Sequence, residues 1–115
     1  MSKPSYVQNP DILLGKRVLG FIRYLDHEGN DLTSVEVYGL VTDVSDDTVL
    51  IDAKVWRKEE NSNDIDVEQV SKFSLPFCDE NFWCAENGDY KSIISEERIP
   101  NPDFLTQWKV HSPED

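Results

Sequence analysis

The chain has 115 residues, a length that fits a single domain, 1–115. Its 23 Asp and Glu against 11 Lys and Arg give a formal net charge of −12 at pH 7. A protein this acidic repels nucleic acid and anionic membranes, which excludes both as expected partners, and it attracts cations or a basic protein. The hydrophobic content of 38% suffices for a folded domain with a small core.

The N-terminal residues are polar and lead to an apolar triplet at 12–14. We expect residues 1–11 to form a flexible arm in front of a β-barrel core at 12–112. No secretory signal is visible, and the longest apolar-rich stretch, residues 18–22, is far too short to span a bilayer. A cytoplasmic location is therefore expected.

The first half of the chain predicts three strands, at 16–25, 35–44 and 48–56. β-Branched and aromatic residues dominate the first strand, and apolar residues alternate along the other two. Polar turns rich in Gly, Asn and Asp separate the strands. Gly39 interrupts the alternation of the second strand and predicts a bulge or a barrel corner.

The second half is less regular. Residues 57–69 are predicted as a long acidic loop or as the ends of two strands of a hairpin. Further strands are predicted at 70–75, 89–94 and 105–110, with an irregular aromatic segment at 77–85. So many short strands in one small domain indicate an all-β fold: a small antiparallel, partly open β-barrel or sandwich of five to seven strands with one long acidic loop.

Two cysteines, Cys78 and Cys84, lie six positions apart. Without a secretory signal, two reduced thiols are expected rather than a disulfide. A zinc site would need further Cys or His at a suitable spacing, and His27 and His111 do not supply it.

Six motifs mark the chain: Gly15-Lys16-Arg17-Val18, Tyr24-Leu25-Asp26-His27-Glu28-Gly29-Asn30, Tyr38-Gly39-Leu40-Val41, Phe73-Ser74-Leu75-Pro76, Gly88-Asp89-Tyr90, and Pro102-Asp103-Phe104-Leu105-Thr106-Gln107-Trp108-Lys109-Val110. Over roughly residues 12–112, they resemble a family of small uncharacterised bacterial proteins. The chain departs from that family's pattern in the insert at 57–69 and in its two cysteines. These are the regions where sequence features specific to a dedicated binding partner would be expected.

In its small size, its acidity and its lack of catalytic residues, and not in any sequence motif, the chain also resembles the immunity proteins of contact-dependent and polymorphic toxin systems. This second resemblance implies a small, acidic, cytoplasmic protein, monomeric before complex formation. It implies that such a protein binds and neutralises a basic nuclease toxin domain.

Two runs of carboxylates contain no basic residue. The first holds Glu59, Glu60, Asp64, Asp66 and Glu68, and the second holds Asp79, Glu80, Glu86 and Asp89. One interpretation is a solvated face, and another is an interface that steers a basic partner. A third is a calcium site at residues 64–68, although this segment lacks the glycine and the spaced bidentate Glu of a calcium loop.

Aromatic residues lie beside both runs. Trp56 closes a strand next to the first run, and Phe82 and Trp83 lie inside the second. Core packing is the commoner fate of an aromatic ring, but Trp is also a preferred interface anchor. Neighbouring residues of a strand point to opposite faces, so either Phe82 or Trp83 is expected to be exposed. Trp108 is expected in the core.

Nothing in the sequence indicates catalysis. No Ser lies in a strand-to-helix nucleophile elbow, and acidic surroundings disfavour a reactive thiolate. We expect no enzyme, no cofactor and no metal site, but an immunity-type protein that covers the active site of a basic nuclease. The alternative is a small-ligand-binding or accessory β-barrel. The expected partner-binding residues are Trp56, Glu59, Glu60, Asp64, Asp66, Glu68, Asp79, Glu80 and Trp83.

Overall fold

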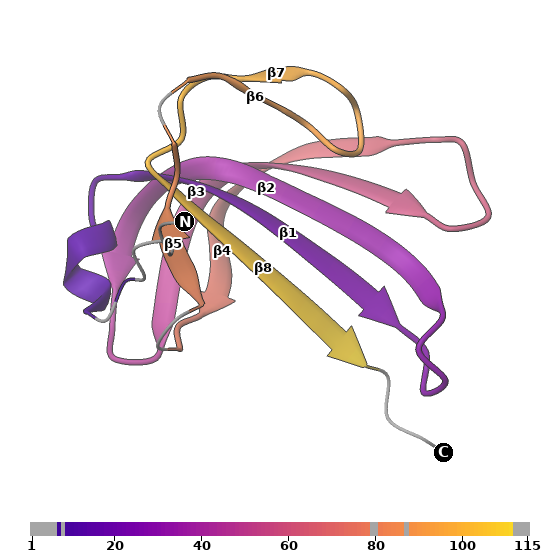
Figure 1. Cartoon of the computed structure of the whole chain (residues 1–115), viewed down its shortest axis with the longest axis horizontal. Coiled ribbons are helices and arrows are strands. Elements are labelled where there is room, and N and C mark those ends of the chain that lie inside the picture. Colours follow the sequence, from indigo (N-terminus) through magenta and orange to yellow (C-terminus); the bar gives the residue numbers. More distant parts are fainter. Residues whose placement is uncertain (1–6, 8, 79–80, 87, 112–115) are drawn as a thin grey trace, which may run out of the picture.

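The computed structural model describes residue 7 and residues 9–78, 81–86 and 88–111. Its elements form one six-stranded sheet and one two-stranded sheet (Figure 1). In chain order they are a short 3-10 helix η1 (Pro10–Leu13) and the strands β1 (Arg17–Leu25), β2 (Asp31–Val44), β3 (Thr48–Glu59), β4 (Asp66–Pro76), β5 (Phe82–Cys84), β6 (Tyr90–Lys91), β7 (Arg98–Ile99) and β8 (Phe104–His111). In this part of the chain no helix is long and apolar enough to cross a membrane.

The large sheet has the strand order β4-β3-β2-β1-β8-β5. It does not close on itself, which confirms the expected all-β, partly open barrel or sandwich. One pairing differs from the antiparallel expectation, because β8 lies parallel to β1. The chain reaches this position by a long crossover through residues 77–103, and a parallel pair always needs such a crossover.

Irregularities in register curl the sheet. The pairing shifts between Tyr24 and Leu25 and between Val41 and Asp43. Gly39 lies two residues before the second shift, in a stretch of regular pairing. A Cβ on Gly39 would lie 2.1 Å from the carbonyl oxygen of Asp52 on β3, so this glycine permits a close approach of two strands.

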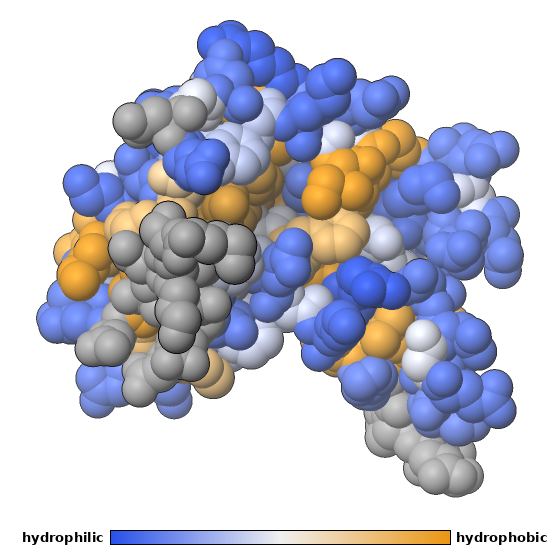
Figure 2. Space-filling model, in the orientation of Figure 1, coloured by the Kyte–Doolittle hydropathy of each residue, from blue (hydrophilic) through white to orange (hydrophobic). Residues whose placement is uncertain are grey.

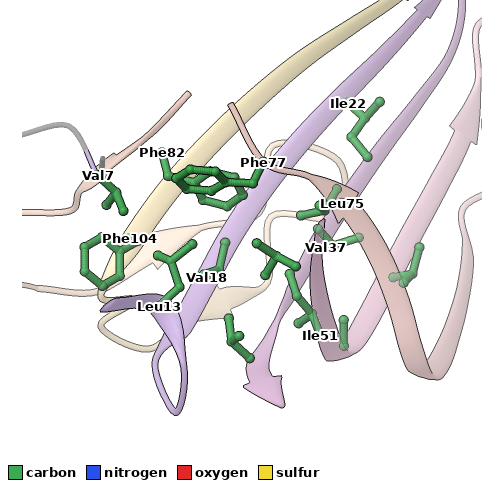
Figure 3. Close-up of a cluster of buried hydrophobic side chains, with 14 of the residues drawn as sticks. Val7, Leu13, Val18, Ile22, Val37, Ile51, Leu75, Phe77, Phe82 and Phe104 are labelled. Carbon is green, nitrogen blue, oxygen red and sulfur yellow. The ribbon is translucent and has the colours of Figure 1, made fainter. Parts of the chain in front are cut away.

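The main core lies on one face of the sheet, called here the inner face. Alternate residues of β1, β2 and β3 point into it, and the rings of Phe77 and Phe82 stack there with centroids 5.6 Å apart (Figure 3). Val7 packs into the same core at 3% exposure, and its N–H donates to the Phe82 carbonyl. The described part of the expected flexible arm is therefore packed against the barrel.

The opposite, outer face carries a second, smaller core. Leu19, Trp56 and Ile99 are buried there beneath the segment of residues 85–103, which crosses this face. The strand predicted at 89–94 is reduced to β6, because Ser92 begins a turn in which its carbonyl accepts the Glu96 N–H. Apolar packing on both faces gives the molecule its sandwich character.

Candidate functional site

The first acidic run forms the end of the β3–β4 hairpin. β3 ends at Glu59 and β4 begins at Asp66, so the predicted long loop shortens to residues 60–65. The Ser62 N–H donates to the Glu59 carbonyl at 3.1 Å, and the Ser62 Oγ accepts from the Asp64 N–H at 3.0 Å. Of the two alternatives for this segment, the structure supports the hairpin with extended strand ends.

All five carboxylates of this run are exposed, and they define the acidic hairpin: Glu59, Glu60, Asp64, Asp66 and Glu68. In register, Asp66 lies opposite Arg57 and Glu68 lies opposite Val55, so the two acidic residues share one face of β4. Within the described chain, none of the five makes an ion pair or accepts a side-chain hydrogen bond. The carboxylates of the hairpin are therefore not held in ion pairs by the described residues, although Arg57 lies opposite Asp66.

Several carboxylates elsewhere in the described chain have local structural partners. Asp31 accepts two hydrogen bonds from Arg23, Asp26 accepts the N–H groups of Glu28 and Asn30, and Asp103 accepts the Arg17 N–H. Hydrogen bonds from the Asn30 backbone are the largest cause of the lowered pKa of Asp26. The acidic hairpin differs from these sites because its carboxylates stabilise no turn and no strand pairing in the described structure.

A shallow groove runs beside the acidic hairpin. It has a volume of about 320 Å³ and is lined by Val55, Arg57, Asp66, Val67 and Glu68. Val67 is 48% exposed, and Ile65 in the adjoining loop is 38% exposed. The hairpin thus presents apolar side chains between its charges, a combination that suits a protein interface.

Trp56 is not available as an anchor, which corrects the sequence-based expectation. Its side chain is 2% exposed, because residues 85–103 cover the outer face of β3. Lys54 Nζ lies 5.2 Å from the ring centroid and donates to Glu97 at 2.9 Å. This hydrogen bond is the main reason why the pKa of Glu97 is lowered. Trp56 is part of the packing of the outer face.

The second acidic run is described only in part. Asp79 and Glu80 lie outside the described residues, whereas Asp89 accepts from Arg98 Nε at 2.6 Å, which lowers the pKa of Asp89. Phe82 is fully buried and Trp83 is half-buried on the other face of β5, as their adjacency predicted. Trp83 lies at the β5 edge of the sheet, far in strand order from the acidic hairpin on β3 and β4.

The remaining candidate chemistry is limited. Cys78 and Cys84 are exposed free thiols. Across the described residues, no group of three or more His, Cys, Asp or Glu side chains is placed to hold a metal ion. Trp108 packs partly buried against the inner core, in keeping with its expected position.

Sequence reasoning missed two features of the outer face. One is Glu36, a carboxylate with 1% exposure, which the alternation of β2 placed on the face away from the main core. The other is a groove along β1 and β8. Both arise because residues 85–103 cross the outer face, and no local pattern in that segment indicated this path.

Comparisons with protein-family models, with curated proteins and with solved structures found no match. The two resemblances described from the sequence therefore remain expectations.

Proposed function

We propose that this protein is a non-catalytic binding protein whose acidic hairpin docks on a basic protein. The partner class is a nuclease-type toxin domain, which makes the protein an immunity protein of a bacterial cytoplasm, monomeric before the complex forms. The observation that supports this most directly is the set of five exposed carboxylates without local partners. Carboxylates that form no ion pair within the protein are available to bind cationic groups of a partner.

The physical basis is charge complementarity. A nuclease active site must attract phosphate, so it presents cationic groups that carboxylates on a projecting hairpin can occupy. Electrostatic steering of this kind raises association rates by about 10- to 1000-fold, with the largest effect at low salt. Ile65 and Val67 provide apolar contacts between the charges, in the role that the buried Trp56 cannot fill.

The test uses the basic domain encoded by a neighbouring gene as the partner. Association rates are measured by stopped flow at several salt concentrations for the wild type and for the charge-reversal variant E59K/E60K/D64K. The proposal expects rapid, strongly salt-dependent association and inhibition of nuclease activity by the wild type. It expects the variant to associate at least about tenfold more slowly at low salt, with a flatter salt dependence.

A matched variant controls for net charge. Asp11, Asp46 and Glu96 are exposed and make no ion pair within the described chain, so D11K/D46K/E96K changes the total charge equally. If both variants associate equally fast, bulk charge and not the hairpin governs recognition. If the neighbouring basic domain neither binds nor is inhibited, the immunity function is refuted.

A further inference from the structure

A groove on the outer face lies away from the acidic hairpin. Its volume is about 520 Å³, and it is lined by Phe21, Arg23, Asn81, Ile93, Gln107, Trp108 and Lys109. A smaller hollow of about 150 Å³ continues from it and shares Phe21, Ile93 and Gln107. Figure 2 shows apolar side chains gathered below the β6–β7 hairpin, where the loop between these strands meets the sheet.

The groove is left open by the unequal lengths of two strands. β5 pairs only with residues 104–106 of β8, whereas β1 pairs with the whole of β8. Beyond Thr106, the described chain supplies no further strand to this edge. Phe21 of β1 and Ile93 of the β6–β7 loop form the apolar walls on the outer face, and Ile93 is 65% exposed. Trp108 lines the groove at the edge of β8, where its ring packs against the inner core. The volume lies within the roughly 300–1,000 Å³ typical of small-molecule sites.

The charged groups of the groove are cationic. Arg23 and Lys109 line it, and no Asp or Glu is among the described residues that line it. Arg23 directs Nε and one Nη at Asp31, which leaves three of its five N–H donors. The amide of Asn81 already donates to Thr106 Oγ1 and to the Gln107 carbonyl. Asp31 offsets the charge of Arg23, whereas Lys109 makes no ion pair within the described chain, so Lys109 is the charge in this groove that favours an anionic ligand.

The charges that line the adjoining hollow do not make the site acidic. Lys91 adds a further cation. Glu36, the single carboxylate among the described lining residues, accepts hydrogen bonds from Ser92 Oγ and from the N–H groups of Ile93 and Ile94. Its charge is therefore engaged by donors of the protein. In both hollows, the apolar part of a ligand would contact aromatic and aliphatic side chains.

We propose that the groove binds a small amphipathic carboxylate. The apolar part of the ligand packs against Phe21 and Ile93, and the carboxylate lies near Lys109 and the free donors of Arg23. This site is separate from the acidic hairpin, so ligand binding here does not depend on the function proposed above.

The test compares three probes that share a tail and differ in the head group: octanoate, 1-octanol and octylammonium. Binding is followed by two-dimensional amide NMR of the full chain, which also locates the site. We expect saturable octanoate binding with a Kd of about 1 mM or tighter, as ligand size allows. The amides of Phe21, Ile93, Gln107 and Lys109 are expected to shift, and octanoate is expected to bind more tightly than octanol.

Two pairs of matched variants sharpen the result. I93D places a carboxylate in the groove and is expected to weaken octanoate binding at least about tenfold, whereas I65D on the acidic hairpin leaves it unchanged. K109Q is expected to weaken binding about two- to fivefold, and K72Q on β4 to have no effect. All four residues are exposed, so the folded state tolerates these changes.

Three results would overturn the proposal. They are the absence of saturable octanoate binding, equal or tighter binding of octylammonium at the same amides, and octanoate binding that I93D and K109Q leave unchanged. Loss of nuclease-domain binding in the hairpin variants has no bearing on octanoate binding, which keeps the two proposals distinguishable.

Discussion

The carboxylate of Glu36 on β2 accepts a hydrogen bond from the hydroxyl of Ser92, 56 positions further along the chain. The same carboxylate accepts the N–H groups of Ile93 at 3.2 Å and Ile94 at 3.4 Å. Ser92 Oγ in turn accepts the Ser95 N–H at 3.0 Å. One buried acidic side chain thus fixes the turn that holds the covering segment on the outer face.

Removing this acceptor is expected to destabilise the protein. Glu36→Ala leaves three buried or half-buried donors unpaired and is expected to lower the free energy of unfolding by about 3 kcal/mol. Glu36→Gln retains one acceptor oxygen and is expected to cost about 1 kcal/mol. Urea denaturation measures both, with the exposed Glu96→Ala as control. Equal stability of wild type and Glu36→Ala would contradict the anchoring role.

The close approach of β2 and β3 makes Gly39 sensitive to substitution. Gly39→Ala places a methyl group 2.1 Å from the Asp52 carbonyl oxygen and 2.6 Å from Ala53 Cα, so the backbone must move. We expect a loss of about 3 kcal/mol by urea denaturation. Gly20→Ala meets only side-chain methyl groups at 3.0 Å and is expected to cost about 1 kcal/mol. A reversed order of the two variants would refute this explanation.

The Lys54–Glu97 ion pair predicts a pH dependence. The pKa of Glu97 is lowered from 4.5, so the pair contributes stability above that pH and loses it as the pH falls through the folded-state pKa. Glu97→Gln is expected to melt at a lower temperature than wild type at pH 7. The difference should vanish once the pH falls below the lowered folded-state pKa of Glu97, as thermal unfolding at a series of pH values would show. A difference that stays constant with pH would rule out the ionic contribution.

The carboxylates of β4 also bear on self-association. β4 pairs only with β3 and carries the exposed Val67 between Asp66 and Glu68. Charges on an edge strand oppose pairing with a second copy. D66N/E68Q is therefore expected to associate at high concentration, as measured by sedimentation velocity. D11N/D46N, which removes the same charge elsewhere, is expected to stay monomeric, and identical behaviour of both variants would argue against edge protection.

The local features of the fold could be predicted from the sequence. Alternating apolar residues indicated β2 and β3, and turn residues such as those at 45–47 separated them correctly. The parallel pairing of β1 with β8 could not be predicted, because it depends on contacts far apart in the chain. The same holds for the burial of Trp56 and Glu36, whose covering segment has short strands and an irregular path.

The candidate site was predictable in its charge and less so in its geometry. The exposure of Glu59, Glu60 and Asp64 follows from their place in a polar, charged run and holds in the structure. The groove beside Trp108 was not foreseen, because it is formed by strand ends of unequal length and a loop from elsewhere in the chain. Such hollows have no signature in a local sequence pattern.

The position of β8 between β1 and β5 has a consequence for the order of folding during synthesis. The Arg17 N–H donates to the Asp103 carboxylate, 86 positions away, at the start of the parallel pair. As the chain leaves the ribosome, β1 to β4 can assemble by neighbouring hairpins, but the second edge of β1 stays open until β8 is made. Pairing over such a separation is slow, so the nascent chain exposes this edge until β8 has emerged.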